Sequence, residues 1–479
     1  YNSGNGAGIT LSSSDSNNLT DITAIGSGTG VNIYWSDFTI LKNAELINSS
    51  YWDVYYETGE SYMDCHSQFI NVTGTDNKPI VFFNSSVQIQ SWNNNVSEII
   101  LCGADYSVID NLTMNHTDKK NNGLILVATQ HTNITNSLFV NLYDIVVDYG
   151  SQYNNFINIT IIDNSKKGIY LKDAGFNNFK NVSITGGNYG IHIYDRGKCT
   201  LDKITVKNCE KGIELRYSNN DNLTNLTVEN NTYGISIINS NSTIIKDSLI
   251  SNSTTADIEQ WSTSDYGYTT YLINTTFNKT NVTIGGSDRI VVKWYLDVYV
   301  NSSGGNPING ANVTGWQSNG TQVFSELTNS SGYIQRKTLI EYIQNSSQVY
   351  LDNVTYYTPY TINASKIGYE TNSTQINLTQ TLATHLTLQG ELPEITWIVP
   401  ANNNSTKVNG TLIHNITFED ENLYMVNCTI YSDSAMTNPV WSVQYNLTGN
   451  TTWTLTDEVN ISNWTDGIYY ENCTVTDFD

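Results

Sequence analysis

Apolar residues recur along the middle of this chain with a period of 22 to 23 residues. Each repeat contains three short segments in which apolar and polar residues alternate, and polar turns separate these segments. Alternation with a period of two is typical of β-strands that bury one face. A repeat this short cannot enclose a core by itself, so the pattern predicts strands that stack from one repeat to the next. Successive repeats begin at His131, Tyr153, Phe176, Lys198, Asn220 and Ser242.

Three columns of apolar residues, each taken from one position of successive repeats, define the expected register. They are Ile134, Phe156, Phe179, Leu201, Leu223 and Ile245; then Phe139, Ile161, Ile184, Val206, Val228 and Ile250; and, after a glycine, Ile169, Ile191, Ile213 and Ile235. Strands stacked about 4.8 Å apart in this register form a parallel β-helix. We therefore predict an all-β protein with a right-handed parallel β-helix over residues 1–288 and its best-defined coils at about 105–264. A leucine-rich repeat is the main alternative, but the Leu and Asn spacing differs and no helical segment follows.

The same residues resemble the parallel β-helix repeat family of surface and periplasmic proteins and of sugar hydrolases and lyases. The resemblance is strong from Asp110 to Asn252, and weaker copies extend upstream around Asp21, Asn43 and Asn71. It implies a fold and leaves the function open, because one fold serves many functions.

Asparagine recurs at the bend between the second and third strands of each repeat. Asn tolerates the left-handed backbone that such a bend needs, and stacked Asn side chains can hydrogen-bond along the helix axis. We expect these amides to point inward and to form a ladder without glycans, although several lie in Asn-x-Ser/Thr sequons. The predicted ladder contains Asn136, Asn158, Asn181 and Asn225, with Asn111 upstream and interruptions at Lys203 and Asp247.

About three dozen Asn-x-Ser/Thr sequons are spread over the chain, which is typical of an extracellular glycoprotein. We expect N-glycans on turns of the β-helix and on the C-terminal part, where no repeat pattern explains the sequons. The predicted acceptors are Asn222, Asn230, Asn241, Asn252, Asn312, Asn372, Asn415 and Asn446.

The repeat ends near residue 288, and short alternating strands between turn clusters follow. Residues 289–390 resemble the carboxypeptidase-regulatory-like, transthyretin-like β-sandwich, whose turns match at Pro307, Gly310, Gly332 and Gly368. Residues 391–479 resemble an immunoglobulin-like β-sandwich, which implies that Trp441 packs on an inter-sheet Cys428–Cys473 disulfide. We also consider a second disulfide, Cys65–Cys102, and expect Cys199 and Cys209 to be buried thiols at different corners of one coil.

The net charge of −23 argues against nucleic acid and anionic membranes as partners. Only 14% of residues are charged, compared with about 25% in a typical protein, so Asn, Ser, Thr and Tyr supply the polar surface. No apolar run is long enough to cross a membrane, and we expect no direct membrane insertion. Six cysteines favour an oxidising, extracellular location at the cell surface.

One constellation on the outward face suggests chemistry. His192 and Glu214 are expected one repeat apart, close enough for a hydrogen bond. Together they could act as a general base, with Arg216 binding an acidic sugar. A solvated face of mixed charge is the stronger reading, because the paired aspartates of polygalacturonases and the Arg/Asp pattern of pectate lyases are missing and the chain has only four arginines. We therefore expect no catalytic site, no metal site and no cofactor.

Two weaker signals remain. The acidic stretch Phe418–Tyr424 is expected to be a polar turn, with Ca²⁺ as the alternative. Outward aromatic residues such as Trp92, Trp261 and Trp316 suggest stacking on sugars, although tryptophan more often packs in cores or at module junctions.

The order of modules resembles archaeal surface proteins, as does the Asn-, Thr- and Tyr-rich composition. We expect an extracellular structural glycoprotein, a homo-oligomeric subunit of a filament, sheath or S-layer. A glycan-binding adhesin or fibre that contacts surface polysaccharides is the second hypothesis, and a polysaccharide lyase or hydrolase is the third.

Overall fold

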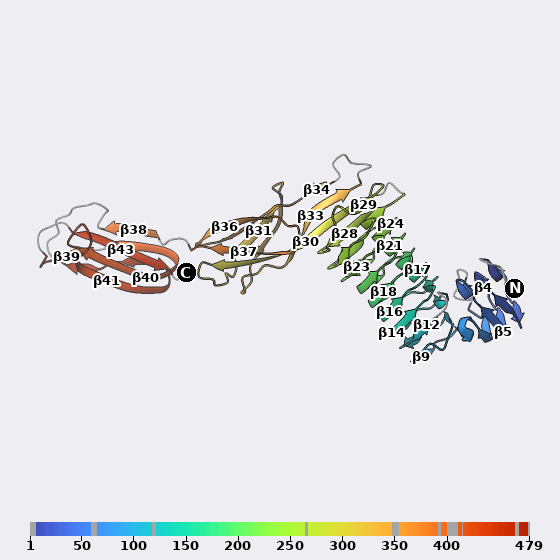
Figure 1. Ribbon diagram of the computed structural model, residues 1–479. Coiled ribbons are helices and arrows are strands. Elements are labelled where there is room, and N and C mark those ends of the chain that lie inside the picture. The colour runs from blue at the N-terminus through green and yellow to red at the C-terminus, as the bar shows by residue number, and fades with distance from the viewer. Residues whose placement is uncertain are drawn as a thin grey trace. The chain divides into compact units, whose positions relative to one another are not determined.

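The computed structural model describes residues 6–58, 65–116, 121–263, 267–346, 354–390, 394–399, 411–413, 415–464 and 469–477. The fold is all-β and divides into two compact units (Figure 1). The first unit contains Tyr1–Trp294 and Ile340–Tyr356, and the second contains Tyr295–Leu339 and Tyr357–Asp479. The boundary expected after residue 288 therefore falls six residues earlier than the observed one. The reason is that β30 (Arg289–Ser302) first pairs, through Arg289–Lys293, with the last coils of the first unit.

The first unit is a right-handed parallel β-solenoid, and one of its walls is a sheet of ten strands. Ile169, Ile191, Ile213 and Ile235 pair in register along this wall and are fully buried, so the predicted register is confirmed. In sheet order, the strands are β8 (Ile80–Phe83), β10 (Glu98–Cys102), β13 (Gly123–Val127), β15 (Asp144–Asp148), β17 (Lys167–Lys172), β19 (Tyr189–Tyr194), β21 (Lys211–Arg216), β24 (Tyr233–Ile238), β27 (Ala256–Trp261) and β29 (Val282–Ile284).

The opposite side of the core is closed by a longer sheet that contains the other two predicted columns, and both columns pair as expected. Phe156 and Phe179 stack inside it with ring centroids 4.8 Å apart. Its strands in the first unit are β9 (Gln88–Gln90), β11 (Val108–Asp110), β12 (Thr113–Asn115), β14 (Asn133–Val140), β16 (Asn155–Ile162), β18 (Asn178–Thr185), β20 (Thr200–Lys207), β22 (Asn222–Thr224), β23 (Thr227–Glu229), β25 (Thr243–Lys246), β26 (Leu249–Ser251), β28 (Thr269–Ile273), β30 (which ends in the second unit), β33 (Lys337–Asn345, which begins in the second unit) and β34 (Val354–Tyr356).

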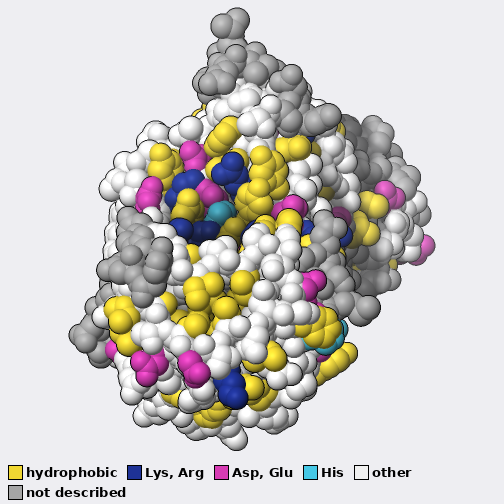
Figure 2. All heavy atoms as spheres, turned by 90° about the vertical axis from the view of Figure 1, so that its right-hand side faces the viewer, with side chains coloured by type: hydrophobic (Ala, Val, Ile, Leu, Met, Phe, Trp, Pro, Cys, Tyr) yellow, Lys and Arg dark blue, Asp and Glu magenta, His cyan; other side chains and the backbone are white. Residues whose placement is uncertain are grey.

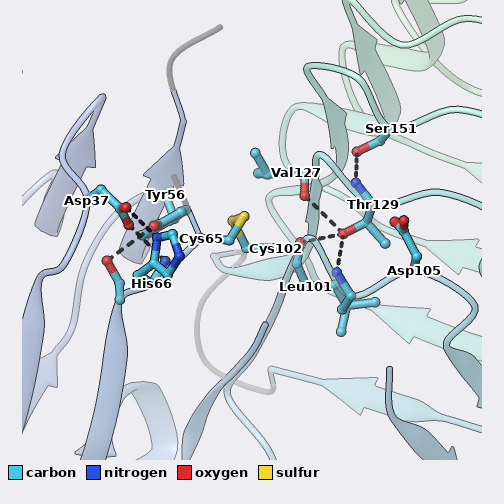
Figure 3. The surroundings of a disulfide bond; sticks show 12 residues. Asp37, Tyr56, Cys65, His66, Leu101, Cys102, Asp105, Val127, Thr129 and Ser151 are labelled. Carbon is cyan, nitrogen blue, oxygen red and sulfur yellow. Dashed lines mark hydrogen bonds and ion pairs between the residues drawn. A yellow bond between two sulfur atoms is a disulfide. The ribbon is translucent and has the colours of Figure 1, made fainter. Parts of the chain in front are cut away.

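The first coils form a separate small solenoid that covers part of the outer face of the ten-stranded wall. Outward-facing Ile100, Ile125 and Val146 are buried in one cluster with Val54 and Tyr56 of β6. The strands of this segment are β1 (Ala7–Ser12), β2 (Asn18–Thr20), β3 (Thr23–Ile25), β4 (Thr29–Tyr34), β5 (Ile40–Ile47), β6 (Trp52–Glu57) and β7 (Gln68–Thr73), followed by the 3₁₀ helix η1 (Thr75–Asn77). A disulfide between Cys65 and Cys102 joins this segment to the end of β10 (Figure 3).

The second unit consists mainly of antiparallel strands. β31 (Asn312–Trp316), β32 (Gln322–Leu327), β35 (Tyr360–Lys366) and β36 (Tyr369–Ile376) form one sheet, and β37 (Leu382–Leu388) pairs with the second half of β30. Gly310, Gly332 and Gly368 have φ of 76°, 77° and 82° at turns, where the sequence places glycines that tolerate this conformation. The remaining strands are β38 (Glu394–Val399), β39 (Thr411–Ile413), β40 (Asn415–Tyr431), β41 (Pro439–Leu455), β42 (Glu458–Asn460) and β43 (Tyr470–Asp477).

Two expectations for the C-terminal residues are wrong. Cys428 and Cys473 form a disulfide, but they face each other on neighbouring strands β40 and β43 of one sheet, so the bond does not connect two sheets. The acidic stretch Phe418–Tyr424 is no turn. It lies inside β40, where the register with β41 shifts between Glu419 and Leu423. Phe418 and Leu423, on either side of this shift, are buried.

Candidate functional site

The outer face of the ten-stranded wall carries three columns of polar and aromatic side chains beyond the part that the first coils cover. The strand register aligns Lys167, Tyr189, Lys211 and Tyr233; then Tyr170, His192, Glu214, Ser236 and Glu259; then Lys172, Tyr194, Arg216, Ile238 and Trp261. This is the alignment that the sequence predicts for His192, Glu214 and Arg216. Figure 2 shows basic, acidic and histidine side chains gathered in a hollow on one face, with hydrophobic side chains around them.

His192 lies at the centre of these columns and is 8% exposed. Its ring stacks between Tyr170 and Tyr189, with centroid distances of 5.1 and 4.9 Å. Its Nε2 lies 3.2 Å from Oε1 of Glu214. The two groups are not aligned for a hydrogen bond, so both ring nitrogens are buried without a hydrogen-bond partner among the described residues.

Three cations surround this histidine. Burial, followed by the positive charges of Lys167, Lys211 and Arg216, lowers the pKa of His192 to about 3, so the ring is neutral at physiological pH. Lys211 forms an ion pair with Glu214. Burial is the largest single effect and opposes the charge on Lys211, but the hydrogen bond and the charge of Glu214, together with the charge of Glu259, raise the pKa of Lys211 overall.

The other two cations have no such partner. The Nζ of Lys167 lies 3.0 Å from the centroid of the Tyr170 ring and has no carboxylate oxygen within 4 Å among the described residues, whereas the backbone N–H of Lys167 donates to Oδ1 of Asp144 over 2.6 Å. Burial lowers the pKa of Lys167 to about 8, although the charge of Asp144 acts in the opposite direction. The Nε of Arg216 is buried and lacks a hydrogen-bond partner within the described part of the chain.

This arrangement is poorly suited to general-base catalysis. An efficient general base has a pKa near the working pH, whereas the pKa of His192 is about 3. Glu214 is 2% exposed and its carboxylate is paired with Lys211. What the columns offer instead is positive charge next to buried, unused hydrogen-bonding groups.

The asparagine ladder exists, but it lies on the outside of the wall. Asn136, Asn158, Asn181 and Asn225 have φ of 50° to 58°, as expected for the bend. All four side chains are exposed, so the expectation that they point inward is wrong. At this left-handed bend the buried side chain belongs to the next residue, such as Ile159 or Val182.

Hydrogen bonds nevertheless run along this outer ladder. Asn181 donates to Asn158 and Asn158 donates to Asn136, each over 2.8 Å. Asn225 donates to Asp202 over 2.7 Å where Lys203 interrupts the column. The same contacts continue upstream, where Asn71 donates to Asn43 and Asn43 to Asp21.

A buried ladder does occur at a different corner, which sequence analysis missed. Asn154 and Asn177 are 0% and 1% exposed, and each accepts a hydrogen bond from a backbone N–H one coil earlier. Asp221 takes the same position two coils later and accepts from the backbone N–H of Cys199 over 2.8 Å. The signal for this ladder is the Asn-Asn pair that precedes the first strand at residues 154–155 and 177–178.

The predicted glycan acceptors differ in exposure. Asn222, Asn230, Asn252 and Asn446 are exposed. Partly buried acceptors are Asn241, Asn312, Asn372 and Asn415. Asn372 donates from its amide to the carbonyl oxygen of Thr387 over 2.8 Å.

A row of exposed aromatic rings is the most conspicuous feature that the sequence analysis missed. Tyr106, His131, Tyr153 and Phe176 occupy one corner of four successive coils, and neighbouring ring centroids lie 5.1, 5.3 and 5.3 Å apart. Tyr106, Tyr153 and Phe176 are 68%, 46% and 38% exposed. We call these four residues the aromatic row. By contrast, the predicted Trp92, Trp261 and Trp316 are partly buried.

The backbone of the aromatic row is unusual for bulky residues. Its φ values are 55° to 60°, and the same corner is occupied in the next coils by Lys198, Asn220 and Ser242 at 59° to 61°. Left-handed geometry disfavours residues with a Cβ by about 1–2 kcal/mol, and Asn tolerates it better than Tyr or Phe. Asn would therefore fit this corner with less strain than Tyr or Phe, although Trp35, Phe38 and Tyr217 also have φ of 50° to 53° outside the row. The signal was present as Tyr, His, Tyr and Phe at 22- to 25-residue spacing.

Cys199 and Cys209 are buried free thiols. Burial raises the pKa of Cys209 to about 12 and raises the pKa of Cys199 as well, which keeps both protonated and unreactive. Among the described residues, no helix is long and apolar enough to cross a membrane.

Comparisons with known proteins give one family match and several distant structural likenesses. No curated protein matches the sequence. Among solved structures, a tailspike protein from an Escherichia coli bacteriophage is 11% identical over 76% of this chain and 61% of its own, with a TM-score of 0.28. The major pilin subunit BcpA of Bacillus cereus is 13% identical over 39% and 64%, with a TM-score of 0.20. The Bacillus anthracis TIE protein is 15% identical over 41% of this chain, which spans about a third (34%) of that protein, with a TM-score of 0.18.

At these identities and TM-scores, none of these likenesses supports an inference about function. The match to a family covers three of the four residues of the aromatic row (His131, Tyr153 and Phe176), the outer ladder from Asn136 to Asn225 and the columns around His192. Residues 122–277 match the family described as the right-handed β-helix region.

Proposed function

We propose that this chain is an extracellular structural glycoprotein, a subunit of a cell-surface assembly of identical copies such as a filament, sheath or S-layer. The aromatic row carries the proposal. Exposed apolar patches mark interaction sites, and these rings occupy backbone positions that are unfavourable for them in an isolated subunit. Their stacking fixes a rigid ridge on which another copy can pack.

The rings favour protein packing over sugar binding. Sugars stack on the faces of aromatic rings, but in the aromatic row each ring covers the face of the next at 5.1 to 5.3 Å. Lys198 covers the far end, with its Nζ 5.0 Å from the centroid of the Phe176 ring. The row therefore presents ring edges, which suit insertion into a groove of a neighbouring subunit better than they suit the glycan binding of an adhesin.

The extracellular location rests on different observations. The disulfides Cys65–Cys102 and Cys428–Cys473 fit an oxidising compartment. Exposed sequon asparagines line the outer surface, and a glycoprotein is the simplest account of them. We include in this proposal that the chain is an archaeal type of surface protein with transthyretin-like and immunoglobulin-like modules, as the sequence resemblance implies.

We also propose that the chain is not an enzyme. The support is the pKa of His192, which is far below neutral because the ring is buried among cations. His192→Ala and Glu214→Ala should each leave assembly unchanged, and release of reducing ends from acidic polysaccharides by the wild-type chain, lost in either variant, would contradict the proposal.

Sedimentation velocity of the oxidised, glycosylated chain tests the structural role. The wild type should associate as its concentration rises. The triple variant Tyr106→Asn, Tyr153→Asn and Phe176→Asn should remain folded, because Asn tolerates the left-handed corner, and should lose most of this association. Trp35→Asn is the matched control, since Trp35 is 47% exposed with φ of 50° but lies outside the row. Association that is equal in the triple variant and the control would contradict the proposal.

A further inference from the structure

The columns around His192 concentrate positive charge on a strongly acidic chain. Lys167, Lys211 and Arg216 all lie close enough to depress the protonation of this one imidazole, whereas the whole chain carries a net charge of −23. Glu214 is the acid at the centre, and Lys211 already neutralises it. Glu259 lies two strands further on and accepts a hydrogen bond from Ser236. The Nζ of Lys167 and the guanidinium of Arg216 form no ion pair among the described residues, and Asp144 offsets part of the charge of Lys167.

Unused hydrogen-bonding groups lie at the same place. His192 is more than nine-tenths buried, yet neither ring nitrogen has a hydrogen-bond partner among the described residues. The Nε of Arg216 is buried and also unpaired there. Buried polar groups are nearly always hydrogen-bonded, and an unsatisfied one destabilises the folded protein. A bound group that accepts hydrogen bonds would remove this destabilisation.

The neighbouring side chains fix these donors in place. Tyr170 and Tyr189 hold the imidazole between them. Tyr194 meets the His192 ring edge-on at 6.2 Å, and the guanidinium of Arg216 lies 5.7 Å from the centroid of the Tyr217 ring. Donors that are already ordered lose little entropy on binding.

We propose that this face binds an anionic group, a carboxylate, sulfate or phosphate, through the guanidinium of Arg216 and the N–H of the neutral His192 ring, with Lys167 adding electrostatic attraction. Guanidinium groups bind such oxyanions strongly because their N–H donors match the spacing of the oxygens. The anion arrives either as a free inorganic ion or as part of an acidic saccharide, and the chemistry of recognition is the same. This inference goes beyond the structural role and does not depend on self-association.

Two probes separate these sources. Isothermal titration with sodium sulfate, against sodium chloride at the same ionic strength, measures binding of the free ion, and titration with an oligogalacturonate measures binding of an acidic saccharide. The wild type should bind at least one probe saturably. Binding of sulfate but not of the oligogalacturonate would identify the ligand as a free anion. Tighter binding of the oligogalacturonate than of sulfate would identify it as an acidic saccharide.

Variants connect binding to the site. Arg216→Gln should weaken binding at least about tenfold, and Lys167→Gln about three- to tenfold, because a charge-assisted hydrogen bond is lost in the first and only a charge in the second. Lys180→Gln removes an exposed lysine on the opposite wall and should change the affinity less than about twofold. Thermal melting verifies that each variant is folded. The proposal is overturned if the folded wild type binds neither probe, or if Arg216→Gln and Lys167→Gln both bind as tightly as the wild type.

Discussion

Asn181 donates a hydrogen bond from Nδ2 to Oδ1 of Asn158, 2.8 Å away, on the exposed side of the solenoid wall. Nδ2 carries two hydrogens, so a glycan can replace one while the other continues to donate to the preceding coil. The ladder is therefore compatible with modification. This conclusion reverses the expectation, drawn from an inward orientation, that the sequons of the ladder are bare.

Glycans should consequently occur on the ladder as well as on the turns. Asn225 should carry sugar. Its two neighbours in the column are Lys203 and Asp247, which carry no N-glycan that could crowd it. Asn158 and Asn181 lie on adjacent strands about 4.8 Å apart, so crowding should limit each molecule to one glycan at this pair. Glycopeptide mass spectrometry of the native protein checks both points. Unmodified Asn158, Asn181 and Asn225 alongside modified Asn222 and Asn230 would contradict this prediction.

Replacing Asn158 separates the two roles of a ladder residue. Asn158→Gly retains the left-handed bend and loses the side-chain hydrogen bonds, so unfolding should become easier by less than about 1 kcal/mol. Asn158→Ala loses the bonds and also strains the backbone, so the loss should reach about 1–2 kcal/mol. Chemical unfolding of both variants measures the difference. Equal losses would mean that backbone strain contributes nothing at this bend.

Asp221 should make the solenoid less stable as the pH rises. Burial raises its pKa to about 6 in the folded state, although hydrogen bonds from Ser218 and the backbone of Cys199 oppose this. The folded state therefore binds a proton more tightly than the unfolded state, so the stabilisation present below the unfolded pKa of 3.8 is lost between that pH and about 6. Asp221→Asn should remove this dependence and stabilise the fold at pH 7.5 by about 1–3 kcal/mol.

Unfolding at pH 4 and at pH 7.5 tests this prediction. The control is Asp202→Asn, because hydrogen bonds from Asn225 and Thr224 lower the pKa of Asp202 despite slight burial, so its replacement should destabilise the fold at pH 7.5. A gain in stability for Asp221→Asn that is the same at both pH values would argue against titration as the cause.

The Cys65–Cys102 disulfide should hold the first coils on the ten-stranded wall. The double variant Cys65→Ser, Cys102→Ser should lower the stability of this segment by about 2–4 kcal/mol. Hydrogen exchange should accelerate in β4 and β6, where the apolar cluster around Val54 would open to solvent. The matched double variant Cys428→Ser, Cys473→Ser should leave exchange in these strands unchanged. Unaltered exchange in the first variant would show that packing alone holds the segment.

The repeat pattern predicts the solenoid well because burial imposes a regular choice of residue. Each inward position must be apolar, so Ile191, Ile213 and Ile235 define the register without knowledge of the structure. The side on which Asn158 lies could not be read from its sequence. A left-handed bend favours Asn for its backbone, whether the side chain is buried or exposed.

Contacts between segments that are distant in the sequence could not be predicted from the repeat pattern either. The covering of Ile100, Ile125 and Val146 by the first coils has no periodic signal. The columns around His192 could be aligned in advance, but the pairing of Lys211 with Glu214 and the unpaired Nε of Arg216 depend on side-chain positions. The disulfide in the second unit was predicted as a pair, whereas its position within one sheet follows from the pairing of β40 with β43.

The most direct test of the structural role is electron cryomicroscopy of the native surface assembly, or of the oxidised, glycosylated chain at high concentration. We predict repeating copies of the chain, with density of a neighbouring copy packed against Tyr106, His131, Tyr153 and Phe176. Separate single chains at every concentration, or an ordered assembly in which these four rings face solvent, would contradict the account.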